Sequence, residues 1–188
     1  MLSVIIATHD SERPLVQTLA ALVSGATAGL ISEVIVADAG SRDETAVVAD
    51  VAGCNFLTLE GPSGRRLKAA AAAARAPWLL FLVAGTLLDG SWIGEAQRFI
   101  EQPALAQQRA AVFRRGTPSP SALREAMALI AGALRPQHSP EQGLLIAKAL
   151  YQRLGGHAEN AADAEREFLR RLGRRRTVTL ATGAFFAG

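Results

Sequence analysis

Short apolar runs alternate along the first half of the chain with segments whose apolar residues recur at helical spacing. Four runs resemble strands, at residues 2–8, 34–38, 55–59 and 78–83. They lack the polar alternation of a half-exposed strand, which is typical of strands buried on both faces of a parallel sheet. The alternation predicts an α/β fold with a mainly parallel central sheet, helices on both faces and right-handed connections.

Glycines and prolines set the expected ends of the helices. The first helix is predicted to begin near Pro14 and to be broken at Gly25 and Gly29. The GPSG sequence at 61–64 is predicted to be a loop. It precedes a helix over residues 67–75 that contains six consecutive alanines, the best helix formers.

The second half of the chain is predicted to add more elements to one domain spanning residues 1–188. Strands are expected at 110–114, 143–148 and 176–181, and helices at 91–102, 121–134 and 162–172, with a short helix that ends at Gly155 and Gly156. We interpret the apolar stripe of the helix at 121–134 as core packing rather than as a membrane or partner surface.

The turn after the second strand carries the first candidate chemistry. Residues 33–45 read EVIVADAGSRDET, so Asp38 ends a buried strand just before Gly40. Ser41 and Asp43 can then cap the next helix. Ligands bind at this carboxyl edge in open α/β sheets, so Asp38 is a candidate binding residue. An ordinary strand-to-helix loop is the alternative.

Composition excludes several classes of protein. The chain has 188 residues, is 49% hydrophobic and has mean hydropathy +0.19, ample for a core. No apolar run reaches the ~18 residues of a membrane span. The only cysteine, Cys54, excludes an internal disulfide and a cysteine-based zinc site. A strand-like start without a basic leader indicates no signal peptide, so we expect a cytoplasmic protein.

The formal charge is +3, and the basic residues form two clusters. The first comprises Arg65, Arg66 and Lys68, and the second Arg170, Arg171, Arg174, Arg175 and Arg176. Aromatic residues are only 5% and are not interleaved with these clusters, so we expect no nucleic-acid partner. A phosphate-bearing small molecule or the surface of an anionic membrane suits the clusters better.

Several sequence motifs occur in an order that resembles a known family. They are SVIIATHD at 3–10, ADAGSRDET at 37–45, LLFLVAGT at 79–86, EQGLLI at 141–146 and the glycine pair 155–156. With them the chain resembles the family 2 glycosyltransferases of the GT-A fold, whose members read roughly SVIIPTxNE, VDxGSxDGT, LLFLxADT and, in a small bacterial branch, DQGIFV. The resemblance spans nearly the whole chain.

The resemblance implies transfer of a sugar from a nucleotide-diphosphate sugar to an acceptor. It implies a nucleotide-binding half at residues 1–90 and an acceptor-side half at 91–188. Asp38 would contact the base or ribose of the donor, and Thr8, Gly40 and Ser41 would line the same pocket. The acceptor is unknown; in this family it is often lipid-linked, so the second basic cluster is a candidate for peripheral contact with the inner face of the membrane.

The chain departs from the family where a carboxylate normally holds Mg²⁺ or Mn²⁺ against the diphosphate. The corresponding residues are Val83, Ala84 and Gly85, and none has a side chain that ligates a hard cation. Asp89, four residues on, is expected to be a loop or helix-cap residue. The sequence therefore predicts no Mg or Mn cofactor and a degenerate DxD motif.

The family base, an acid in an ED-type motif after the double glycine, corresponds to Glu165, with Glu167 two residues further on. A solvated glutamate in a charged helix is the alternative. Lys68 stands where relatives have an asparagine, and with Arg65 and Arg66 it could stabilise a departing diphosphate without metal. A solvent-facing basic helix face is the competing interpretation.

The leading hypothesis is therefore a glycosyltransferase, metal-independent if active. The alternative is a catalytically inactive relative kept as a nucleotide-sugar-binding or scaffold protein. A nucleotidyltransferase is disfavoured, because no glycine-rich, lysine-containing phosphate loop follows the first strand.

Overall fold

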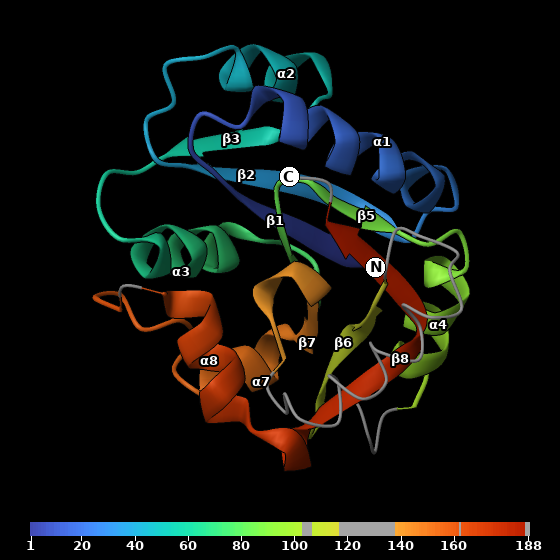
Figure 1. Ribbon diagram of the computed structural model, residues 1–188. Helices are drawn as coiled ribbons and strands as arrows, with labels where there is room; N and C mark the ends of the chain where they lie inside the picture. Colours follow the sequence, from blue (N-terminus) through green and yellow to red (C-terminus); the bar gives the residue numbers. More distant parts are fainter. Residues whose placement is uncertain (103–106, 117–137, 162, 187–188) are drawn as a thin grey trace, which may run out of the picture.

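A single mixed sheet of eight strands organises the described residues, 1–102, 107–116, 138–161 and 163–186, of this computed structural model (Figure 1). The strands lie in the order β3-β2-β1-β4-β7-β6-β8-β5. Their bounds are β1 Leu2–Thr8, β2 Ile31–Asp38, β3 Asn55–Thr58, β4 Trp78–Val83, β5 Thr86–Leu88, β6 Ala110–Arg115, β7 Leu144–Ala147 and β8 Thr177–Phe186. The helices are α1 Glu12–Thr27, α2 Thr45–Val51, α3 Ser63–Ala73, α4 Trp92–Ile100, α7 Lys148–Arg153 and α8 Ala164–Leu172, with 3-10 turns η1 Pro140–Gln142 and η2 Arg174–Arg176.

Most of the strands run in one direction. β1 is parallel to β2 and β4, β2 to β3, and β6 to β8, whereas β7 is antiparallel to β4 and β6, and β5 to β8. The carboxyl ends of β1, β2, β3, β4, β6 and β8 therefore lie at one edge of the sheet. This confirms the predicted mainly parallel sheet and gives it the edge where α/β proteins bind ligands.

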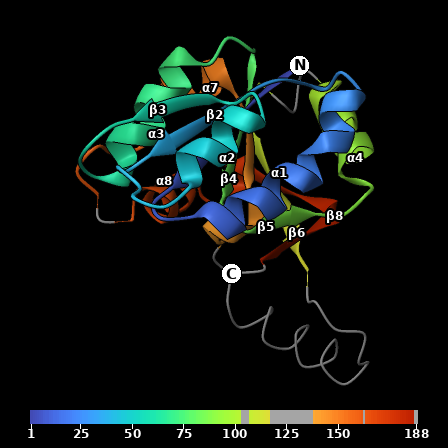
Figure 2. The same cartoon turned by 90° about the horizontal axis from the view of Figure 1, so that it is seen from above.

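Helices cover both faces of the sheet, as predicted (Figure 2). One core cluster joins the sheet to residues of α1, α2 and α4, and a second joins it to residues of α3, α7 and α8. β1 shows why: Val4 and Ile6 belong to the first cluster, while Ile5, between them, belongs to the second. Alternate side chains of a strand point to opposite faces, so a continuous apolar run requires cover on both.

Two predicted helix bounds are wrong, and a close contact explains the first. α1 runs through Gly25, because this glycine lets the helix lie against Trp92: an added Cβ would stand 2.3 Å from the indole ring. The helix ends where Gly29 takes a φ of 69°. The GPSG loop at 61–64 is partly helical, since α3 already begins at Ser63.

Other elements differ from the prediction in extent. The three-residue strand β5 was not predicted, because its formation depends on pairing with the distant strand β8. β8 continues to Phe186 rather than ending at 181, and Lys148 opens α7 instead of ending a strand. The helix predicted at 121–134 lies outside the described residues. Within the described ranges, no helix is both long and apolar enough to span a bilayer.

Candidate active site at the carboxyl edge of the sheet

Asp38 is the centre of a hydrogen-bonded turn at the end of β2. Its Oδ1 accepts hydrogen bonds from the hydroxyls of Thr8, at 2.8 Å, and Ser41, and its Oδ2 accepts from the backbone N–H groups of Gly40 and Ser41, both at 2.7 Å. Burial raises the pKa of this carboxyl, but the hydrogen bonds outweigh burial and hold the pKa below its usual value. Gly40 has a φ of 89°, which the tight turn requires.

The structure thus brings the four predicted binding residues Thr8, Asp38, Gly40 and Ser41 into one cluster. A carboxylate offers about four acceptor positions, and those of Asp38 are all used within the protein. A nucleotide would have to replace one of these donors to bind the Asp38 carboxylate directly. The contact of Asp38 with a donor base or ribose stays a prediction.

The loops after β1 and β2 are joined to each other by further hydrogen bonds. The Asp10 N–H donates to the Ser41 hydroxyl at 2.8 Å, and the Arg42 N–H donates to the Asp10 carboxylate at 2.7 Å. Asp43 accepts from the N–H of Glu12 at 3.0 Å, so it supports the start of α1 as well as that of α2. These bonds hold two adjoining strand ends in one fixed arrangement.

The first basic cluster separates into three different environments. Lys68 is exposed and pairs with Glu159, with 2.9 Å between Nζ and Oε1, and Arg65 is also exposed. Arg66 is buried, with 9% of its surface exposed. Its Nη1 donates to the Gly61 carbonyl, and its buried Nε has no partner within the described part of the chain. Burying an N–H without an acceptor is unfavourable, so the Arg66 Nε–H is a donor whose hydrogen bond the described residues leave unmade.

Glu165 lies close to Arg66 because the starts of α3 and α8 are side by side. A Cβ added to Gly64 would stand 2.0 Å from the Ala158 carbonyl oxygen and 3.0 Å from the Cβ of Ala164, so only glycine permits this approach. Burial, and then the charge of Asp163, raise the pKa of Glu165 to about 7, while Arg66 acts in the opposite direction.

A carboxyl with this pKa exchanges its proton near neutral pH, as a general base requires. Glu167, by contrast, forms an ion pair with Arg171, with 3.3 Å between Oε2 and Nη2. His157 is 1% exposed, and burial together with Arg171 lowers its pKa to about 3. It packs among aromatic rings and its Nδ1 lies 2.8 Å from the Tyr151 hydroxyl, so it is neutral and enclosed.

Arg171 stabilises the double-glycine turn rather than contributing to a free basic surface. Its Nη1 donates to the Leu154 carbonyl at 2.8 Å, its Nη2 donates to the Gly156 carbonyl, and its guanidinium lies 5.0 Å from the centre of the Phe168 ring. The sequence could not indicate this role, because the carbonyls it binds lie fifteen or more residues away along the chain.

Val83, Ala84 and Gly85, at the end of β4, have no side chain that could ligate a divalent metal ion. Gly85 has a φ of 96° and donates its N–H to the Thr18 hydroxyl at 2.8 Å, and an added Cβ would stand 3.2 Å from the Phe186 ring. Among the described parts of the chain, no group of three or more His, Cys, Asp or Glu residues could hold a metal. Asp89 lies in the loop between β5 and α4, one of its two predicted roles, and its Oδ1 accepts hydrogen bonds from the N–H and hydroxyl of Ser91.

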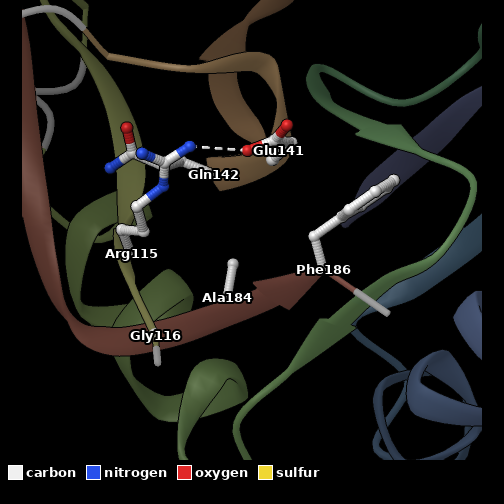
Figure 3. A pocket seen from close by; sticks show the side chains of 6 residues that line it. All are labelled: Arg115, Gly116, Glu141, Gln142, Ala184 and Phe186. Carbon is white, nitrogen blue, oxygen red and sulfur yellow. Dashed lines mark hydrogen bonds and ion pairs between the residues drawn. The ribbon is translucent and has the colours of Figure 1, made fainter. Parts of the chain in front are cut away.

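A hollow of about 180 Å³ lies at the same edge, beyond β4 (Figure 3). It is lined by residues from the ends of β6 and β8 and from η1, namely Arg115, Gly116, Glu141, Gln142, Ala184 and Phe186. Sequence reasoning singled out neither Arg115 nor Phe186. The EQGLLI motif was the only signal for this region, since it contains Glu141 and Gln142.

The sequence profile of the glycosyl transferase family 2 matches residues 3–158. No curated protein matches the chain. Among solved structures, TarS residues 1–349 from S. aureus has 17% identity and a TM-score of 0.71, over 98% of this chain and 60% of that one. The same fragment with UDP has 18% identity and a TM-score of 0.70, over 98% and 59%.

Glucosyl-3-phosphoglycerate synthase from Mycobacterium tuberculosis, solved with Mn²⁺, UDP and phosphoglyceric acid, has 16% identity and a TM-score of 0.65, over 95% of this chain and 67% of that one. The chain therefore spans about three fifths to two thirds of the length of these structures. At such identities the likeness shows the GT-A fold. The profile match covers most of the sequence, and the chain belongs to glycosyl transferase family 2.

Proposed function

We propose that the protein transfers a sugar from a nucleotide-diphosphate sugar to an acceptor hydroxyl without a bound divalent metal. Family membership supports the reaction class, and related structures contain UDP or UDP-GlcNAc. The observation that carries the proposal is the pair of Glu165 and Arg66 at the adjoining starts of α8 and α3. One is a carboxyl that titrates near neutral pH, and the other is a buried cation with an unused donor.

In the proposed reaction Glu165 accepts the proton of the acceptor hydroxyl. The acceptor oxygen then bonds to the anomeric carbon, while the bond from that carbon to the diphosphate oxygen breaks and its electron pair stays on the diphosphate. Arg66 donates to the departing diphosphate and stabilises its charge. General base catalysis of this kind typically contributes 10²–10⁴-fold in rate.

Of the three basic residues, Arg66 is the best suited to the diphosphate. Its Nε–H has no acceptor among the residues that the structure describes, whereas Lys68 is already paired with Glu159. Arg66 also lies in the first turn of α3, which has no side-chain cap, and free N–H groups at a helix start favour anions. Arg65, exposed beside it, adds to the positive charge.

The alternative function is a catalytically inactive relative that binds a nucleotide sugar or serves as a scaffold. The missing carboxylates at Val83, Ala84 and Gly85 favour it, and so does the fully occupied carboxylate of Asp38. An inactive relative would keep the same nucleotide site as the transferase, but it would not need Glu165 as a general base.

Nucleotide diphosphates and their sugars should stabilise the protein in the presence of a chelator. A ligand at ~100 times its dissociation constant adds ~2.7 kcal/mol, a rise in Tm of roughly 5–10 °C for a chain of this size. Arg66→Met should lose most of this shift, whereas the matched control Lys68→Met should keep it. Each shift is measured by thermal unfolding against the same variant without ligand.

A shift that requires Mn²⁺ would contradict metal independence. Equal shifts in Arg66→Met and in the unchanged protein would contradict the role of Arg66. No shift with any nucleotide would refute the donor site altogether.

We also propose a lipid-linked acceptor, reached through peripheral contact with an anionic membrane. Arg170, Arg175 and Arg176 are exposed around the end of α8 and η2, and basic clusters attract anionic lipid. The protein should sediment with anionic liposomes at low salt but not with neutral ones, and replacing the three arginines with glutamine should abolish sedimentation. Arg42→Gln, in the loop after β2, is the control. If anionic liposomes leave the protein in solution, the cluster is a solvated helix end.

A further inference from the structure

The double-glycine turn after α7 brings two backbone carbonyls to one side chain. Gly155 and Gly156 have φ values of 80° and 66°, a left-handed backbone that other residues rarely adopt. Leu154 is the C-cap of α7, so its carbonyl is one of those at a helix end that lack a helical partner and carry partial negative charge. Arg171 Nη1 donates to the Leu154 carbonyl and Nη2 to the Gly156 carbonyl. The planar fork of a guanidinium suits two such acceptors better than a lysine would.

Arg171 belongs to the same helix as Glu165. It lies in the last turn of α8 and Glu165 in the first, roughly 9 Å apart along the axis at 1.5 Å per residue. Between them, the buried ring of Phe168 packs with its centre 5.0 Å from that of His157, the residue that follows the turn. Because backbone hydrogen bonds hold α8 together as one unit, the bonds that Arg171 makes at one end restrict where Glu165 lies at the other.

The turn also contacts α3, the helix that carries Arg66. α8 lies next to α3 (Figure 1), and the chain that leaves the turn brings the Ala158 carbonyl so close to Gly64 that no side chain would fit there. Gly64 precedes Arg66 by two residues in α3. The turn therefore contacts α3 through Ala158 and α8 through its two bonded carbonyls, so it sets the position of one helix relative to the other.

The charges that act on Glu165 come from the start of α8 and from α3. Burial and the charge of Asp163 raise the pKa of Glu165 to about 7, and Arg66 acts in the opposite direction. η1 also packs against α8, but its carboxylate, Glu141, is paired with Arg115. The charge of the guanidinium at the far end of α8 is not among the causes of this pKa. An influence of that guanidinium on Glu165 must therefore act through the position of the helix.

We propose that Arg171 is a positioning residue: by binding the double-glycine turn it holds Glu165 beside Arg66. A displacement of about 1 Å at a reacting group can cost ~100-fold in rate, so the bonds of Arg171 matter to a general base that they do not touch. That Glu165 acts as a base rests on the proposed function. That Arg171 fixes its position does not.

Carbon-13 NMR of the glutamate carboxyls tests the proposal on the whole protein without any need for turnover. The Glu165 signal is the one missing from Glu165→Gln. In Arg171→Met, α8 should loosen and water should reach Glu165, so the pKa of Glu165 should fall from about 7 toward its ordinary 4.5. A general loss of stability would lower Tm without changing this pKa.

The same variant has an expected effect on turnover. In Arg171→Met kcat should fall ~100-fold, and the rise of kcat with pH should move to lower pH together with the pKa of Glu165. The thermal shift with nucleotide diphosphates should remain, because Arg66 lies on α3 and keeps its contact with the Gly61 carbonyl.

Three further variants serve as comparisons. Arg171→Lys keeps the charge but not the fork of donors, so the pKa of Glu165 should lie between those of Arg171→Met and the unchanged protein. Glu167→Gln removes the ion pair with Arg171 but leaves both carbonyl bonds, so it should not change that pKa. Arg98→Met, in α4 on the other face of the sheet, is the control for the loss of a surface arginine.

An unchanged pKa of Glu165 in folded Arg171→Met would overturn the proposal, and so would an equal fall in Glu167→Gln. If Arg171→Met does not fold, Arg171→Lys decides: a lower pKa supports the proposal and an unchanged one overturns it. A lower pKa in Arg171→Met, combined with no turnover by the unchanged protein, would support the role of Arg171 and refute the transferase. Normal turnover with the pKa unchanged in Arg171→Met would refute the positioning role alone.

Discussion

Replacing Asp38 with alanine is expected to lower the free energy of unfolding by about 3 kcal/mol or more. The change removes the acceptor of two backbone N–H groups, those of Gly40 and Ser41, and of two hydroxyls. A buried donor left without a partner destabilises a protein by about 1–3 kcal/mol, although the hydroxyls can rotate toward other acceptors. Denaturant unfolding of both proteins measures the difference.

Asp38→Asn provides the matched comparison, because asparagine keeps one acceptor oxygen in nearly the same volume. It should lose less stability than Asp38→Ala, and the exposed Asp50→Ala should change little. Equal stability of Asp38→Ala and the unchanged protein would show that the turn does not depend on these bonds. Loss of nucleotide binding in Asp38→Ala alone would not show a contact with the donor, because the turn itself is expected to rearrange.

The dependence of stability on pH follows from the lowered pKa of Asp38. The native carboxyl has a pKa below the ordinary 3.8, so its contribution is fully present above that pH and is lost as the pH falls through the native value. The stability difference between the unchanged protein and Asp38→Asn should therefore be constant near neutral pH and shrink in acid below about 3.8.

The sequence predicted the parts of the site that adjoining residues determine. β1 has the predicted bounds, and the run of apolar residues ahead of Asp38 put a carboxylate at the ligand-binding edge. The hydrogen bond that Thr8 donates to Asp38 was harder to predict from the sequence, because Thr8 lies thirty residues away and reaches Asp38 only through strand pairing. For the same reason the sequence could not distinguish the environments of Arg65, Arg66 and Lys68. The partner of Lys68, for example, is Glu159, ninety-one residues further along the chain.

Contacts between distant elements also set the properties that the sequence could not show. Glu165 could be read as a solvated residue of a charged helix, and its burial depends on the approach of α8 to α3 at Gly64. The exposed ring of Phe186 depends on β8 extending past 181 to pair with β5. Neither the approach of α8 to α3 nor the pairing of β8 with β5 leaves a periodic pattern in the sequence.

Replacing Glu165 with glutamine is expected to lower kcat by 10²–10⁴-fold while nucleotide binding stays nearly the same, because the amide cannot accept the acceptor proton. In the unchanged protein kcat should rise with pH through about 7, as Glu165 ionises, and it should be nearly flat in Glu165→Gln. Glu167→Gln, which removes only a surface ion pair with Arg171, is the control and should retain activity.

Stability should change with pH in the opposite direction to activity. The native pKa of Glu165, about 7, lies above its ordinary 4.5, so the contribution of the uncharged carboxyl is fully present below 4.5 and is lost as the pH rises through 7. Glu165→Gln does not titrate, so relative to the unchanged protein it should gain up to about 3 kcal/mol between these pH values. A solvated glutamate would give neither the rise in kcat nor this gain. A scaffold without transferase activity would give the gain in stability but no turnover at any pH. The two measurements together therefore separate a partly buried general base from an inactive relative.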